Sequence, residues 1–120
     1  MANRPTIMGT RHVIAAGHYL AAHAGFAILE AGGNAVDAGV ASGIAMGVLQ
    51  TDKVNFGGVA PLIVYLAKKK EIHCIDGLGV WPQMITPDFF KKFHGGKIPA
   101  SVLRSVVPAA PDAWITALER

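Results

Sequence analysis

Apolar residues recur at helical spacing in two stretches near the start of the chain. The first stretch begins after Gly17 and ends at Gly32 and Gly33, a pair typical of a helix C-terminus. Asn34 then stands where it can cap a second helix, which runs to about Leu49. The spacing predicts an apolar face on each helix, made of Leu20, Ala24, Ile28 and Ala31 on the first and Val36, Val40, Ile44 and Val48 on the second.

Glycines recur at every fourth position of the second predicted helix, at Gly39, Gly43 and Gly47. Each glycine inside a helix costs about 1 kcal/mol relative to alanine. Close packing against a neighbouring backbone would offset that cost. We therefore expect this helix to be deeply buried, with its glycines against another element.

Short apolar runs predict strands. Residues 12–16 are expected to form a short buried strand, and residues 62–66 and 72–75 a hairpin joined by a charged turn. Residues 105–107 are a further candidate strand. The chain thus combines helices with short strands, and the expected fold class is α+β.

Two more helices are predicted in the second half. Thr86 and Pro87 form a strong helix start, and the short helix that follows ends at Gly95. A last helix opens at Pro111 and has no stop signal before Arg120. One side of it carries Trp114, Ile115 and Leu118.

Composition indicates a folded segment of a larger protein. Hydrophobic residues make up 52% of the 120 positions and charged residues 16%, against about 25% charged in an average domain. So apolar a chain is not disordered, and its length allows one domain at most. Few charges are left to cover the outside, so we expect a missing partner to hide part of the surface.

Charge and hydropathy exclude several partners. The net charge is only +3 and the one basic run, residues 68–70, has no aromatic residues for base stacking, so no nucleic acid is expected. The apolar run without charge at residues 13–29 has 17 residues, fewer than the roughly 20 needed to cross a bilayer. With no export signal and a single cysteine, the expected location is the cytoplasm.

The residues alone assemble no complete catalytic group. The five histidines fit no metal-ligand spacing, and neither a metal nor another cofactor is expected. Cys74 is predicted to be a small buried hydrophobe rather than a nucleophile. Gly57 and Gly58 could hold an anion through backbone N–H groups, or could simply form a tight turn.

One stretch is specific. Residues 28–38 read ILEAGGNAVDA, which resembles the N-terminal signature of the gamma-glutamyltranspeptidase family. A small-residue helix, a Gly-rich loop before LIVY, a DG loop and the VVPAAPDAW segment follow in the family's order. The resemblance covers residues 11–120, after an irregular lead-in of residues 1–10, and corresponds to the first part of the large subunit.

The resemblance implies a four-layer αββα sandwich of the N-terminal-nucleophile hydrolases. The family's precursor cuts itself into two subunits, and a threonine becomes the first residue of the small one. The implied partners are therefore the remainder of the large subunit, the small subunit and a small amide substrate, with a homo-oligomer of processed heterodimers also compatible. No threonine of this chain lies in the context of the processing site, so no catalytic residue is expected here.

Two loops depart from the family pattern. In the family, an Arg-Glu pair follows Asp-Gly, and its arginine holds the substrate α-carboxylate; here Leu78 and Gly79 stand at those positions. The family's Gly-rich loop is also altered, and Asn55, Gly57 and Gly58 are its residues expected near the cleft. Three functions stay open: an amide hydrolase not tuned to gamma-glutamyl groups, a glutathione hydrolase or gamma-glutamyltransferase that takes its cation from elsewhere, and a non-catalytic structural domain.

Overall fold

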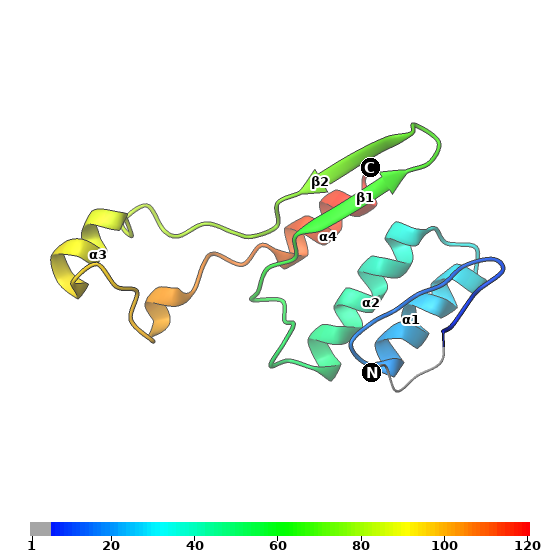
Figure 1. The fold of residues 1–120 in the computed structure, drawn as a ribbon, viewed down its shortest axis with the longest axis horizontal. Coiled ribbons are helices and arrows are strands. Elements are labelled where there is room, and N and C mark those ends of the chain that lie inside the picture. The colour runs from blue at the N-terminus through cyan, green and yellow to red at the C-terminus, as the bar shows by residue number, and fades with distance from the viewer. Residues whose placement is uncertain (1–5) are drawn as a thin grey trace. The chain divides into compact units, whose positions relative to one another are not determined.

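The computed structural model describes residues 6–120, so the first half of the expected lead-in lies outside the described residues. The chain forms two compact units; the first ends at Lys53 and the second spans Val54–Arg120. Helices and a strand pair make it an α+β structure (Figure 1). The elements are α1 (Tyr19–Glu30), α2 (Ala35–Leu49), β1 (Leu62–Leu66), β2 (Glu71–Ile75), α3 (Pro87–His94), a 3₁₀ turn (Val102–Arg104) and α4 (Ala110–Leu118).

Helices α1 and α2 of the first unit form as predicted, and they lie side by side (Figure 1). Asn34 Oδ1 accepts hydrogen bonds from the N–H groups of Val36 and Asp37 at 2.7 and 3.1 Å. Between the helices, Gly32 has a φ of 92°, a conformation that glycine adopts without strain. The cap of α1 was not predicted: His18 Nδ1 accepts from the N–H of Leu20 at 3.2 Å.

The buried faces of α1 and α2 differ from the predicted ones. Most of the buried residues are small, because the two helices approach closely enough for the Ser42 hydroxyl to donate to the carbonyl of Ala21 at 3.0 Å. Of the predicted face residues, Val40 is buried as expected. The predicted face residues Leu20 and Val48 are exposed instead. The buried residues are Ala21 and Gly25 on α1, and Ala38, Val40, Ser42 and Met46 on α2.

A close contact at a glycine occurs at Gly25 of α1, and none occurs at Gly39 of α2. A Cβ on Gly25 would overlap Ile14 and Ser42 and lie 2.7 Å from the carbonyl oxygen of Ala38, whereas a Cβ on Gly39 would meet nothing within 4 Å. Among the described residues, the expectation that Gly39 lies against a backbone is therefore wrong.

Residues 12–16 do not form the predicted strand. No strand of the described chain includes them, because a strand needs a partner and no neighbouring strand pairs with this segment. Side chains hold the segment to α1 instead. Glu30 accepts from Arg11 at 2.7 Å and lies 2.9 Å from His12 Nε2, and the His12 ring packs edge-on to Phe26.

In the second unit, β1 and β2 form the predicted antiparallel hairpin, with Ile63 opposite Cys74 and Tyr65 opposite Ile72. Those four residues share one face of the hairpin, and that face is exposed. The prediction that Cys74 is buried is therefore wrong, because the alternation of β2 turns it outward with Ile72. The opposite face is half-buried and also apolar, through Leu62, Val64, Leu66 and Ile75.

Helix α4 lies beside the hairpin (Figure 1). The ring of Trp114 packs edge-on to that of Phe56, with 5.3 Å between the ring centroids. Alanines and Trp114 are the buried residues of α4, while Ile115 and Leu118 are exposed, contrary to the predicted face. The helix ends at Leu118 with Glu119 as its cap residue, so the prediction that it continues to Arg120 is wrong.

The segment between β2 and α4 carries α3. Thr86 Oγ1 accepts from the N–H of Phe89 at 3.2 Å, and Gly95 caps the C-terminus in the left-handed conformation, both as predicted. Phe90 is buried against Trp81. Residues 105–107 form no strand. Within residues 6–120, every helix is too short or too polar to cross a bilayer.

Candidate functional site

Three loop segments that are far apart in the sequence are joined by backbone hydrogen bonds in the second unit. The Ala60 N–H donates to Gly77 O, and the Val107 N–H donates to Val80 O, each at 2.8 Å. We call residues 55–61, 76–82 and 105–110 the loop platform. Its third tie is the Gly58 carbonyl, which accepts from the N–H groups of Ala109 and Ala110 at the start of α4, at 3.1 and 3.2 Å.

Leu78 is held between two glycines of the platform. Gly77 and Gly79 have φ angles of 54° and 71°, which residues with a Cβ rarely adopt. A Cβ on Gly77 would overlap the carbonyl oxygen of Ala60, and one on Gly79 that of Val107. The backbone around Leu78 is therefore fixed from both sides, while its side chain is 50% exposed and does not contribute to the core.

The Gly-rich loop forms a tight turn. The N–H of Gly58 donates to the Asn55 carbonyl at 3.0 Å, and a Cβ on Gly57 would lie 3.1 Å from Asn55 Oδ1. The tight-turn interpretation is thus sufficient to explain both glycines. The structure brings Asn55, Gly57 and Gly58 into the same platform as Leu78 and Gly79.

The platform is almost uncharged. Asp76 is the only ionisable side chain in its three segments. Along the chain, the nearest charged residues outside the three segments are Lys53, Arg104 and Asp112, the last in the first turn of α4. The side chains that the platform exposes are mostly apolar: Phe56, Val59, Leu78, Val80 and Val107.

Trp81 is a platform residue that the sequence did not single out. Its ring packs against Phe90, and its indole nitrogen is buried without a hydrogen-bond partner among the described residues. Only Val80 separates Gly79 from the Trp81-Pro82 pair, so the aromatic ring anchors the end of the loop that carries Leu78.

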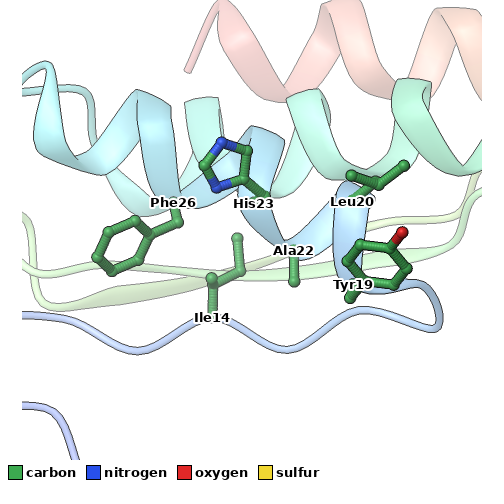
Figure 2. Close-up of a pocket in the computed structure, with 6 residues that line it drawn as sticks. All are labelled: Ile14, Tyr19, Leu20, Ala22, His23 and Phe26. Carbon is green, nitrogen blue, oxygen red and sulfur yellow. The ribbon is translucent and has the colours of Figure 1, made fainter.

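A separate hollow lies on the first unit. Figure 2 shows it between α1 and the extended segment before it, lined by Ile14, Tyr19, Leu20, Ala22, His23 and Phe26. It is open and mainly apolar, and it holds none of the predicted site residues. Within residues 6–120, no three His, Cys, Asp or Glu side chains cluster closely enough to hold a metal ion.

Comparison with known proteins establishes the family. The sequence profile described as Gamma-glutamyltranspeptidase matches residues 21–120. The chain therefore belongs to the gamma-glutamyltranspeptidase family, as the signature in residues 28–38 indicated.

One relative is named as glutathione hydrolase-like and another as an acylase. The chain is 31% identical, over 118 residues, to the Glutathione hydrolase-like YwrD proenzyme of Bacillus subtilis (strain 168), covering 95% of this chain and 22% of that protein. It is 37% identical, over 122 residues, to the Acylase ACY 1 proenzyme of Pseudomonas sp. (strain V22), covering 93% of this chain and 22% of that protein. The chain thus spans about a fifth of the length of these relatives.

The fold agrees with the family. The crystal structure of Helicobacter pylori gamma-glutamyltranspeptidase matches 96% of this chain with a TM-score of 0.82 and 27% identity. The match covers 34% of that protein's chain. The α+β arrangement described above is therefore a fragment of the gamma-glutamyltranspeptidase fold.

Proposed function

We propose that this chain is the N-terminal segment of the large subunit of a self-processing amide hydrolase. The complete protein would form the four-layer αββα sandwich, and a threonine outside residues 1–120 would become the N-terminal nucleophile of a small subunit. Relatives named as proenzymes support this proposal. The remaining large subunit and the small subunit would then be the partners of this chain, and processed heterodimers could assemble further. The single cysteine favours a location in the reducing cytoplasm.

The proposed chemistry has a simple physical basis. A threonine hydroxyl is a weak nucleophile, and the α-amino group of the same residue can serve as its base once the precursor is cut. Backbone N–H groups then stabilise the negative charge that develops on the carbonyl oxygen. This chain would contribute no reacting group, but its loop platform would line the place where the acyl group binds.

We further propose that the acyl group is not gamma-glutamyl, and one observation carries this specificity. Leu78 stands where the resemblance expects an arginine, in a loop whose backbone is fixed by Gly77 and Gly79. A guanidinium binds a carboxylate through two charge-assisted hydrogen bonds, and an isobutyl side chain offers none. The similarity to a protein named as an acylase supports the same proposal.

Glutathione hydrolysis is the second candidate, because a relative of comparable similarity carries a glutathione hydrolase-like name. It would require a cation from another part of the full-length protein to replace the missing arginine. The loop platform itself contains no lysine or arginine, so it cannot supply this cation.

Expression of the full-length protein tests both the proposed self-processing and the proposed acyl specificity. Self-processing is followed on a denaturing gel, and sequencing of the smaller product is expected to give threonine first. A precursor that stays intact would instead favour the non-catalytic structural domain. On the processed protein, gamma-glutamyl p-nitroanilide is expected to react about 30- to 1000-fold less efficiently than a simple acyl anilide. Efficient turnover of the gamma-glutamyl compound would instead favour glutathione hydrolysis as the function.

A further inference from the structure

The charge of the loop platform restricts what can bind there. Asp76 is its one ionisable side chain, and the nearest in the following helix is another acid, Asp112. The basic residues of the second unit lie outside the platform, in the hairpin turn at residues 68–70, on α3 and after it; Arg104 directly precedes the third segment, and its Nε donates to the Pro99 carbonyl at 3.0 Å. An anionic group on the platform would therefore meet a carboxylate and no lysine or arginine of these segments.

Asp76 is available to a ligand. It directly follows β2 and its side chain is exposed. Among the described residues, no hydrogen bond or ion pair engages its carboxylate. An exposed acid on a surface helix would be unremarkable, but this acid lies within a group of apolar side chains.

Asp76 directly follows the last pair of the hairpin. Leu62 pairs with Ile75, and one further hydrogen bond joins Ala60 to Gly77, so Pro61 and Asp76 lie between two cross-chain ties. The φ of 54° at Gly77 ends the extended pairing there. One glycine separates Asp76 from Leu78, so their Cα atoms are at most about 7 Å apart.

Charge and apolar surface occur together on the platform. The exposed carboxylate of Asp76 attracts a cation and repels an anion, and Val59 and Leu78 are exposed apolar side chains of the same platform. The same surface offers dispersion contacts to a short alkyl chain. The local chemistry thus suits an acyl group with an alkyl chain and a positive end.

We infer that Asp76 is a specificity-determining residue, and that it selects acyl groups that carry an ammonium group and no carboxylate. The alkyl chain would lie on Val59 and Leu78 and the ammonium group would pair with Asp76. This inference rests on the proposed amide hydrolysis, and it goes beyond the loss of gamma-glutamyl specificity by naming the charge that the site accepts.

Four p-nitroanilides separate the two charges on one carbon chain. The gamma-glutamyl compound has both charges, the glutaryl compound only the carboxylate, the 4-aminobutyryl compound only the ammonium, and the butyryl compound neither. In each, water cleaves the C–N bond and releases p-nitroaniline with the free acid. On the processed full-length protein we expect kcat/KM for 4-aminobutyryl to exceed that for butyryl about tenfold or more, and glutaryl to fall below butyryl by a similar factor.

Two matched variants assign the preference to Asp76. Asp76→Asn is expected to reduce the ratio of 4-aminobutyryl to butyryl turnover to about one. Asp112→Asn removes the same charge nearby on α4 and is expected to leave that ratio unchanged. Asp76→Ser is the second variant if Asp76→Asn does not process. If neither variant processes, the wild-type ratio of 4-aminobutyryl to butyryl turnover decides, and a ratio of one or less overturns the inference.

The outcomes distinguish this inference from the proposed function. Cleavage of none of the four anilides, or an unprocessed precursor, overturns the proposed function itself. Amide cleavage in which the ammonium group gives no gain, or a gain that survives Asp76→Asn, overturns the role of Asp76 and leaves the hydrolase in place.

Discussion

The reciprocal cap at the start of α2 ties two backbone segments together. Asn34 Oδ1 accepts from the N–H groups of Val36 and Asp37, and Asp37 Oδ2 accepts from the N–H of Asn34 at 2.8 Å. Both side chains therefore satisfy N–H groups that the helix itself leaves without partners. The pattern is local, which is why the sequence predicts this cap correctly.

Replacing Asn34 by alanine is expected to destabilise the protein by about 1 kcal/mol, because two N–H groups lose their acceptor. The measurement is the urea midpoint of the full-length protein. Asn34→Ser keeps a capping oxygen and is expected to retain most of the stability. Equal losses for the two variants would contradict the capping role.

Gly79 combines an unusual φ with a close contact. Gly79→Ala is expected to cost more than Gly96→Ala, because Gly96 has a similar φ of 75° but open space around it. The control variant carries only the backbone strain of about 1 kcal/mol or somewhat more. The difference in thermal unfolding between the two full-length variants measures the overlap with the Val107 carbonyl. No difference would mean that the platform shifts freely at this point.

At the scale of elements, the sequence predicts the ends of the helices better than their buried faces. The end of α3 follows from Thr86 and Gly95, which act on adjacent backbone. The buried face of α1 depends on how closely α2 approaches. Ala21 and Gly25 are small enough to permit an approach that a larger residue would block. The apolar periodicity favours Leu20, because it registers hydrophobicity and not the size of the gap.

Strands are predicted only where both partners are adjacent in the sequence. Residues 62–66 and 72–75 find each other across a short turn, whereas residues 12–16 and 105–107 have strand-like composition but no ladder in the described chain. A pairing that depends on a distant segment leaves no local signal.

Two identical substitutions test the helix contact. Gly25→Ala is expected to lower the Tm of the full-length protein, since the new methyl group would overlap Ile14 and approach the Ala38 carbonyl. Gly39→Ala is expected to leave the Tm unchanged or to raise it, because alanine favours the helix by up to about 1 kcal/mol. A loss at Gly39 as large as at Gly25 would show that another part of the full-length protein approaches α2 there.

At the scale of the whole molecule, the core is made largely of small residues. Among residues 6–120, five of the nine buried hydrophobic residues are alanines: Ala21, Ala38, Ala110, Ala113 and Ala117. Many large apolar side chains are exposed, among them Ile63, Tyr65 and Ile72 on the hairpin. Alanine burial removes little apolar area from water, so the hydrophobic gain per residue is small.

Residues 1–120 expressed alone are therefore expected to unfold without a cooperative transition. Calorimetry and NMR chemical-shift dispersion provide the measurement, with the full-length protein as the control. A soluble monomer with one sharp melting transition would contradict this expectation.

The candidate site is predictable from sequence only in part. The family signature locates the loop of Leu78, and it predicts that a catalytic threonine lies elsewhere. The tie between Gly77 and Ala60, and that between Val80 and Val107, need coordinates, because each joins segments that no local pattern connects. The isolation of Asp76 among apolar side chains emerges only when those segments are brought together.

Because Cys74 is exposed, the reactivity of its thiol can report whether another part of the protein covers this face of the hairpin. Its thiol lies on the apolar face of the hairpin, beside Ile63, and is the only one in residues 1–120. Maleimide labelling followed by peptide mass spectrometry would report the fraction of molecules in which that face is open. Slow modification in the native full-length protein and rapid modification after denaturation would show that another part of the protein covers the face.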